Sequence, residues 1–172
     1  MSASIVLGID LGTTRTKVGL ISTNGRAIGF ARADHKMEME PATGRAEQDP
    51  EAWWAGLGTA IRAAVSAATA DNAGGTALTD PVAICVVGHG PSLTAVDSEG
   101  RAVRPAITWL DSRARGEQAE LEEATGLRGW ALGVLPAARW LERPRTDRGG
   151  LARVGLERSF LYDADPHVVE RG

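Results

Sequence analysis

The sequence predicts an α/β domain with a mixed sheet, because three short strands at its start are followed by strand and helix segments in alternation. The chain has 172 residues, of which 43% are hydrophobic and 24% are charged, as in an ordinary globular domain. Its 19 basic and 22 acidic residues give a formal charge of -3. A nucleic-acid partner would require clustered excess positive charge, so we expect none.

No apolar run approaches the ~20 residues that a bilayer crossing needs. The apolar run near the N-terminus is interrupted at Asp10, too early for a secretion signal. The chain has one Cys, which excludes a disulfide framework within it and a zinc site of several Cys ligands. We therefore expect a cytoplasmic protein without a membrane partner.

The first three strands form a predicted β-meander. Residues 5–9 are apolar and β-branched, as in a buried strand. Residues 16–22 alternate polar and apolar side chains, which predicts a second strand paired with the first. Asn24-Gly25 is a strong hairpin signal and leads into a third antiparallel strand at 27–33. This order differs from the strand–helix alternation of a dinucleotide-binding domain.

A polar, irregular segment at 37–49 precedes a predicted helix. Asp49 is the expected N-cap and Pro50 the first helical residue. The apolar residues that follow are spaced by threes and fours, which predicts one buried face. That face comprises Trp54, Leu57, Ile61, Ala64, Val65 and Ala68. The helix is expected to end at 72–75.

The continuous apolar run at 81–87 predicts a second buried strand, parallel to its neighbour in a sheet covered on both faces. Shorter elements are expected beyond it. They are a hairpin of 94–96 with 102–104, a strand at 106–110, and helices at 112–123 and 136–142.

The sharpest chemical signal lies where the first strand ends, in the run Gly8-Ile9-Asp10-Leu11-Gly12-Thr13-Thr14. Gly12 lets the backbone approach a ligand, and successive backbone N–H groups in such a turn can bind an anion. Asp10 beside phosphates fits a Mg²⁺ partner, bound through water. Further donors to phosphate oxygens are Thr13, Thr14 and either Arg15 or Lys17. The alternative interpretation is a plain β-turn in which Asp and Gly serve geometry.

This turn resembles the first phosphate motif of the superfamily that includes actin, heat-shock chaperone ATPases and sugar kinases. Two later stretches resemble the FGGY carbohydrate kinases within that superfamily, nearest to their xylulokinase-like branch. They are Glu47-Gln48-Asp49-Pro50-Glu51-Ala52-Trp53-Trp54, and Gly88-His89-Gly90-Pro91 followed by Trp109-Leu110-Asp111-Ser112-Arg113. The resemblance covers about residues 5–143 and implies a ribonuclease-H-like domain, the fold of the actin-like ATPases.

The resemblance implies transfer of the γ-phosphoryl group of ATP to a hydroxyl of a sugar or polyol, with ATP and Mg²⁺ as cofactors. On the phosphates and Mg²⁺ it places Asp10, Gly12, Thr13, Thr14, Arg15 and Lys17, with Asp10 as the metal residue. On the substrate it places His89, Gly90, Pro91, Trp109, Asp111 and Arg113. Trp109 can pack on sugar C–H edges, and Asp111 and Arg113 offer directed polar contacts.

Plainer interpretations exist for several of these residues. Trp109 can be core alone, Asp111 can cap the helix that begins near Ser112, and Arg113 can be a surface residue of that helix. Trp53 and Trp54 are more typical of packing at the start of a helix than of ligand binding.

The loop after the 81–87 strand departs from the family. Xylulokinases carry Gln-Met-His-Gly where this chain has His89-Gly90-Pro91-Ser92. His89 takes the Gln position, and Gly90-Pro91 replaces the Met-His pair that contacts the substrate. Two side chains that would recognise sugar hydroxyls are absent, which argues against xylulose as the substrate.

Residues 1–148 are expected to form the N-terminal domain of such a kinase, and 149–172 a divergent or frameshifted tail. In the family the general base, an Asp, opens a second domain that this sequence does not reach, so no catalytic residue is assigned. We expect one lobe of a carbohydrate kinase, truncated and inactive alone. The alternatives are a non-catalytic sugar- or phosphate-binding module, or one half of a split kinase completed by a separately encoded C-terminal lobe.

Overall fold

The computed structural model describes residues 4–71 and 81–142, so the predicted tail at 149–172 lies outside the described residues. The described chain divides into two compact units. Unit 1 comprises 4–37, 48–71 and 81–90, and unit 2 comprises 38–47 and 91–142.

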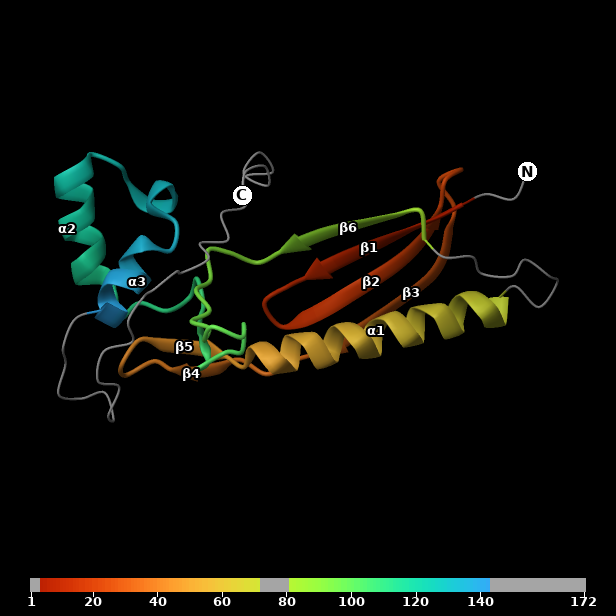
Figure 1. Ribbon diagram of the computed structural model, residues 1–172, viewed down its shortest axis with the longest axis horizontal. Helices are drawn as coiled ribbons and strands as arrows, with labels where there is room; N and C mark the ends of the chain where they lie inside the picture. Colours follow the sequence, from red (N-terminus) through yellow and green to blue (C-terminus); the bar gives the residue numbers. More distant parts are fainter. Residues whose placement is uncertain (1–3, 72–80, 143–172) are drawn as a thin grey trace. The chain divides into compact units, whose positions relative to one another are not determined.

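Unit 1 is a four-stranded mixed sheet with one long helix (Figure 1). Its strands are β1 (Ile5–Leu11), β2 (Arg15–Ser22), β3 (Ala27–Asp34) and β6 (Ala83–Gly88). They lie in the order β3-β2-β1-β6. β2 is antiparallel to β1 and β3, whereas β6 is parallel to β1. The predicted β-meander, the mixed sheet and the parallel strand are therefore confirmed.

The hairpin between β2 and β3 has the predicted Asn24-Gly25 turn. Gly25 has a φ of 88°, a left-handed conformation that glycine adopts without steric cost. Its N–H donates to the carbonyl of Ser22 at 2.8 Å. The local sequence alone determines this turn.

Helix α1 (Pro50–Asp71) covers β2 and β3. Asp49 is its N-cap, since the N–H of Glu51 donates to the Asp49 carboxylate at 3.0 Å. Small side chains spaced by four bring the helix close to the sheet. The buried core of unit 1 comprises Ile5, Leu7, Ile9, Val18, Leu20, Ala60, Ala64 and Ala68.

The predicted apolar face of α1 is wrong at Trp54, whose side chain is 74% exposed. Trp54 precedes Ala60 by six positions, which at 3.6 residues per turn sets it roughly 120° around the helix. The buried face follows Ala60, Ala64 and Ala68, whereas Leu57 and Ile61 pack at its edges. Val65 is likewise displaced from this face and partly exposed.

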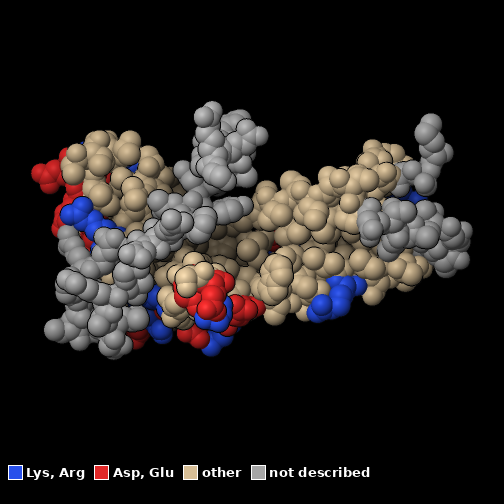
Figure 2. Space-filling model, viewed as in Figure 1, with Lys and Arg blue, Asp and Glu red and all other residues tan. Residues whose placement is uncertain are grey.

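The prediction that strand 81–87 is buried in a covered sheet is also wrong. All residues of β6 are exposed, including Ile84, Cys85 and Val86. β6 is an edge strand whose one neighbour among the described strands is β1. Helix α1 packs on β2 and β3 instead, so β6 gains no cover from it. Figure 2 shows a largely uncharged surface over β6 and α1.

Unit 2 combines a small sheet with short helices. The strands are β4 (Glu38–Glu40), β5 (Arg45–Gln48, whose last residue belongs to unit 1) and β7 (Ala106–Ile107), in the order β4-β5-β7. The helices are α2 (Arg115–Thr125), the 3-10 turn η1 (Gly129–Leu132) and α3 (Leu135–Glu142). Leu93, Ile107 and Trp140 form the buried core.

The polar segment 37–49, expected to be irregular, contains the β4–β5 hairpin. Its register pairs Glu38 with Glu47 and Glu40 with Arg45. Arg45 lies within 4.0 Å of the carboxylates of Glu38, Glu40 and Glu47. Apolar alternation cannot reveal such strands, because charge pairing and a third strand support them.

Three further boundaries differ from expectation. The predicted hairpin of 94–96 with 102–104 is reduced to a single bridge between Val96 and Ala102. The predicted strand at 106–110 ends at Ile107, and α2 begins at Arg115 instead of Ser112. The last predicted helix is confirmed within one residue. No helix in the described ranges has both the length and the apolar character needed to cross a membrane.

Gly29 tests the contact of α1 with β3. A Cβ at this position would lie 2.3 Å from the Ala64 carbonyl oxygen and 2.9 Å from the Ala68 Cβ. Gly29→Ala should therefore lower the free energy of unfolding by about 2 kcal/mol, the usual cost of overpacking. Urea unfolding of the purified chain measures it.

Gly19→Ala on β2 is the matched control, because a Cβ there meets nothing within 4 Å. Equal unfolding midpoints for the two variants would contradict the close approach of α1 to β3.

Candidate functional site

The candidate phosphate site lies at the carboxyl ends of β1 and β6. These strands are parallel, so their carboxyl ends share one edge of the sheet. Asp10 and Lys17 are cross-strand partners. Because strand side chains alternate, both lie on the face opposite to Ile9 and the α1 helix. Lys17 Nζ donates to Asp10 Oδ2 at 2.6 Å, and each side chain is 42% exposed.

The turn that follows β1 is closed by its own backbone. The N–H of Gly12 donates to the Arg15 carbonyl at 3.1 Å. A Cβ on Gly12 would lie 3.0 Å from that carbonyl oxygen, so a larger residue would press against the turn. Thr14 is exposed at its tip, and Arg15 pairs with Asp34 at 3.2 Å.

A divalent cation fits this turn only as part of a phosphate complex. Within 4–71 and 81–142, no three His, Cys, Asp or Glu side chains are grouped to hold a metal. Asp10 offers one half-exposed carboxylate. Mg²⁺ is commonly bound through one or two carboxylates, waters and substrate phosphates. The donor set therefore suits a magnesium–phosphate complex, with Asp10 as the protein's contribution.

Gln48 holds the predicted phosphate turn in place through a hydrogen bond to its backbone. The sequence interpretation did not include Gln48 among the site residues. Gln48 is 1% exposed. Its Nε2 lies 2.7 Å from the Thr13 carbonyl oxygen, 3.1 Å from His35 Nδ1 and 3.2 Å from the Lys36 carbonyl oxygen. Trp53 Nε1 donates to Gln48 Oε1 at 3.3 Å. The sequence feature that could have indicated Gln48 is its position in the Glu47–Trp54 motif.

Two histidines flank the same turn. The backbone N–H of His35 donates to the Thr14 carbonyl at 3.0 Å. His89 directs both its backbone N–H and its Nδ1 at the Leu11 carbonyl, at 2.9 Å and 3.0 Å. Its ring also contacts Trp53 edge to face at 5.3 Å. Within unit 1, His89 therefore contacts the end of β1.

Burial lowers the pKa of His35, and the nearby charge of His89 lowers this pKa further, against a smaller opposing effect of Asp34. Since the amide of Gln48 is the donor in its contact with His35 Nδ1, a neutral ring fits this position. Protonation would replace an acceptor with a donor there.

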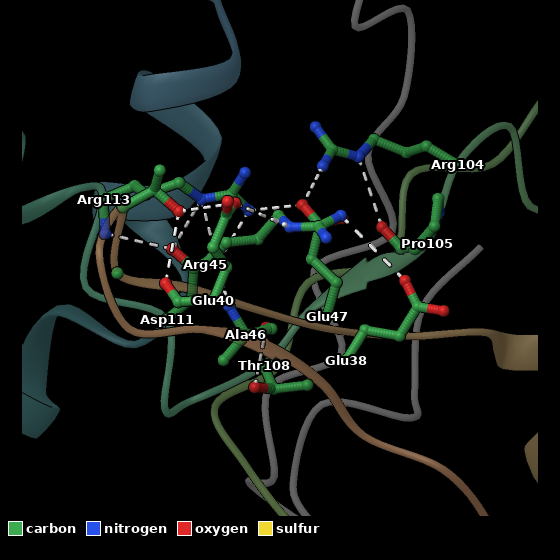
Figure 3. Close-up of polar contacts among 12 residues, drawn as sticks. Glu38, Glu40, Arg45, Ala46, Glu47, Arg104, Pro105, Thr108, Asp111 and Arg113 are labelled. Atoms are coloured by element: carbon green, nitrogen blue, oxygen red, sulfur yellow. Dashed lines mark hydrogen bonds and ion pairs between the residues drawn. The ribbon is translucent and has the colours of Figure 1, made fainter.

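In unit 2, a buried carboxylate organises the predicted substrate segment (Figure 3). Glu47 is another residue that the sequence interpretation did not assign to the site. Its side chain is 5% exposed. Glu47 Oε1 accepts hydrogen bonds from Arg104 Nη2 and Arg113 Nη2, and its second oxygen lies 3.8 Å from Arg45. One carboxylate thus joins β5 to both ends of the 104–113 segment.

Asp111 and Arg113 face each other in the same cluster. Arg113 Nε donates to both carboxylate oxygens of Asp111 at 3.0 Å, and Arg113 Nη2 donates to Oδ2 at 2.7 Å. Asp111 also accepts from the N–H of Ala46 at 2.9 Å. The guanidinium of Arg113 lies 4.4 Å from the centre of the Trp140 ring.

These contacts correct two of the plainer interpretations. Helix α2 begins at Arg115 without a side-chain cap, so Asp111 is not its N-cap and instead closes a turn with the Arg113 N–H at 3.0 Å. Arg113 precedes α2 and is largely buried, so it is not a surface residue of that helix.

The two arginines differ in their electrostatics. Burial lowers the pKa of Arg104, and the Arg113 charge adds to this against the opposing effect of Glu47. Burial acts in the same direction on Arg113, but its hydrogen bonds to Asp111 and Glu47 outweigh this and raise its pKa. The two pKa values differ in direction because Arg113 hydrogen-bonds to two carboxylates, whereas Arg104 hydrogen-bonds to one.

Trp109 is 43% exposed, so it is not a core residue alone. It lines a pocket of about 210 Å³ that Pro91 and Asp111 also line. Pro91, Trp109, Asp111 and Arg113 belong to unit 2, whereas His89 and Gly90 belong to unit 1 together with the phosphate turn. The described units thus hold the predicted residues in two separate groups.

Known proteins are similar to this chain in sequence and in fold. Residues 5–129 match the N-terminal domain of the FGGY family of carbohydrate kinases. Xylulose kinase of Streptomyces coelicolor is 32% identical over 138 residues, which are 78% of this chain and 26% of that protein. Glycerol kinase of Methylobacterium nodulans is 30% identical and covers 91% of this chain and 33% of its own length.

A solved xylulose kinase from Rhodospirillum rubrum matches with a TM-score of 0.67 and 29% identity, over 81% of this chain and 29% of that structure. This match confirms the predicted ribonuclease-H-like fold of the actin-like ATPases. The chain spans about a quarter of the length of the curated xylulose kinases of Streptomyces coelicolor, Streptomyces rubiginosus and Escherichia coli.

The Glu47 cluster predicts a large loss of stability on removal of its central charge. Glu47→Gln leaves Arg104 and Arg113 buried with one charge fewer between them, and should lower the free energy of unfolding by about 3 kcal/mol. Urea unfolding measures the change. The control is Glu40→Gln, whose half-exposed carboxylate lies 3.7 Å from Arg45 and should cost less than about 1 kcal/mol. Equal costs would contradict a central role for Glu47.

His35 predicts a dependence of stability on pH. Because its pKa is lower in the folded chain than the ordinary 6.5, the unfolded chain binds more protons, and stability falls as the pH drops below that value. His35→Gln should reduce the loss of unfolding free energy between about pH 7.5 and 5.5. His167→Gln, which removes the same number of histidines, is the comparison. A pH profile of His35→Gln that matches wild type would refute this.

Proposed function

The chain belongs to the FGGY family of carbohydrate kinases, and we propose that it supplies the phosphate side and the acceptor side of an ATP-dependent sugar or polyol kinase. The observation that carries the proposal is the Asp10–Lys17 pair at the carboxyl ends of two parallel strands, beside a turn held by Gln48. Open α/β sheets bind ligands at such edges.

In this proposal the residues of the turn position the phosphates. Lys17 supplies a positive charge for the transferred phosphoryl group, the hydroxyls of Thr13 and Thr14 donate to its oxygens, and Asp10 holds Mg²⁺ through water. Arg15 adds charge at the same edge, and Gly12 keeps the turn closed. Bound ATP would supply the phosphoryl group, and bound magnesium would neutralise part of the charge on its phosphates.

Phosphoryl transfer depends mainly on positioning and electrostatic stabilisation, so a rigid turn contributes directly. Gln48 provides that rigidity through its contacts with the Thr13 carbonyl and His35. His35 adds a backbone hydrogen bond to the Thr14 carbonyl. Together these two residues hold the carbonyls at the tip of the turn, which leaves its outer side for an anion.

On the acceptor side, we propose that the substrate contacts Pro91 and Trp109, which line one pocket of unit 2. Asp111 and Arg113 act there by holding the segment, since their charges are engaged with each other and with Glu47. The acceptor is a sugar or polyol, because xylulose, glycerol and gluconate kinases are among the related proteins.

We further propose that turnover depends on the three quarters of the related kinases that this chain does not span. The chain is then one lobe, completed by the remaining part of the kinase, and acts in the cytoplasm. The general base and the adenine site are assigned to that remaining part by the family resemblance, and no residue of this chain is assigned to either role.

Binding of magnesium tripolyphosphate to the purified chain tests the phosphate assignment. Thr14→Ala and Asp10→Ala should each weaken it at least about tenfold by isothermal titration calorimetry, equivalent to about 1.4 kcal/mol. The loss in Asp10→Ala should require Mg²⁺, because without the metal this carboxylate repels phosphate.

Thr43→Ala in the β4–β5 turn is the control, since its hydroxyl donates to Glu40 within unit 2 and its loss should leave the affinity unchanged. Wild-type affinity in both phosphate-turn variants would overturn the assignment.

A further inference from the structure

We propose that Trp130, which no sequence motif indicated, forms with Trp109 an aromatic wall that binds the carbon face of a small sugar or polyol. The inference rests on the proposed function and deepens it, because it adds to Trp109 a second residue, Trp130, that lies outside the family motifs. Trp130 lies in η1, whereas Trp109 lies in the loop after β7.

The two tryptophans combine exposure with mutual contact. Trp130 is 65% exposed and Trp109 is 43% exposed. Their ring centroids lie 6.2 Å apart with the ring planes inclined by 35°. Large apolar side chains grouped at a surface are typical of binding sites, and aromatic rings contribute large contact areas with little conformational freedom to lose.

The spacing of the rings defines how a ligand can lie on them. A sugar held between two ring faces would need about 7–8 Å between them, twice the ordinary carbon–carbon contact distance. At 6.2 Å the rings leave no such space. They therefore form one continuous surface, against which the C–H groups of a carbon chain or ring can pack.

Both rings line the same pocket in unit 2, and its volume selects a small ligand. The pocket measures about 210 Å³, below the roughly 300–1,000 Å³ of pockets for drug-sized ligands. Its apolar lining includes Leu93, Ile107 and Val134. A sugar or polyol of a few carbons suits this volume.

Polar groups on α2 complete the chemistry for a hydroxylated ligand. Arg115 and Gln118 line the pocket beside the two rings. Gln118 donates through Nε2 to Glu122 at 2.9 Å, so its amide oxygen has the capacity to accept from a hydroxyl. Asp111, by contrast, has both oxygens engaged by Arg113 and Ala46.

Pro91 also lines the pocket. Its side chain has no polar group, so it contributes no directed polar contact to a ligand there. With Asp111 committed to Arg113, the remaining selective contacts come from the rings and from α2. Loss of Trp130 should therefore weaken acceptor binding.

The test uses the full chain labelled with ¹⁵N, whose five tryptophans give separate indole N–H resonances, assigned by single Trp→Phe variants. D-xylulose, xylitol, glycerol and D-gluconate are the probes. At least one should shift the Trp109 and Trp130 resonances together and leave that of Trp54 in place. Trp130→Ala should then weaken this ligand at least about fivefold, and Trp130→Phe by less.

Trp54→Ala is the matched control, because this tryptophan is also exposed but lies on α1 in unit 1. The Trp54→Ala chain should bind the same probe with wild-type affinity. Unchanged binding in a folded Trp130→Ala chain would overturn the inference. So would the absence of any probe-induced shift at Trp109 and Trp130 in a chain that still binds magnesium tripolyphosphate. If the wild-type chain binds neither the sugar probes nor magnesium tripolyphosphate, the proposed function is overturned together with this inference.

Discussion

Unit 2 depends on the hydrogen bonds and ion pairs of the Glu47 carboxylate. This carboxylate is buried, and two guanidinium groups from opposite ends of the 104–113 segment donate to it. A buried charge is costly unless paired, so the cluster is favourable only when β5 and this segment are in register. The pairing of Arg113 with Asp111 extends the same constraint to the loop that carries Trp109.

The neighbouring residue has the equivalent role in the other unit. Gln48 is buried beside the predicted phosphate turn and contacts the Thr13 carbonyl. The side chains of Asp10 and Lys17 lie on the face of the sheet opposite α1. Two consecutive polar residues, buried in different ways, thus support the two halves of the proposed chemistry. Glu47 and Gln48 therefore connect the short polar strand β5 to both groups of predicted site residues.

Several features followed directly from local sequence, and others did not. The Asn24-Gly25 hairpin and the Asp49 cap were predicted because their causes lie within a few residues. The β4–β5 strands were missed, because the contacts that support them come from residues about 60 positions away. Trp54 and β6 were assigned to the interior, because apolar character does not reveal which face a neighbouring element covers.

The sequence by itself determined the family, the turn after the first strand and the order of the N-terminal strands, since each depends on residue types at short, fixed spacings. Only the tertiary structure decided that Asp111 and Arg113 are bound to each other, that Gln48 supports the turn and that Trp130 joins Trp109. The physical reason is that a polar or aromatic side chain acts through the partner it meets. Those partners lie on other elements, which folding alone brings into contact.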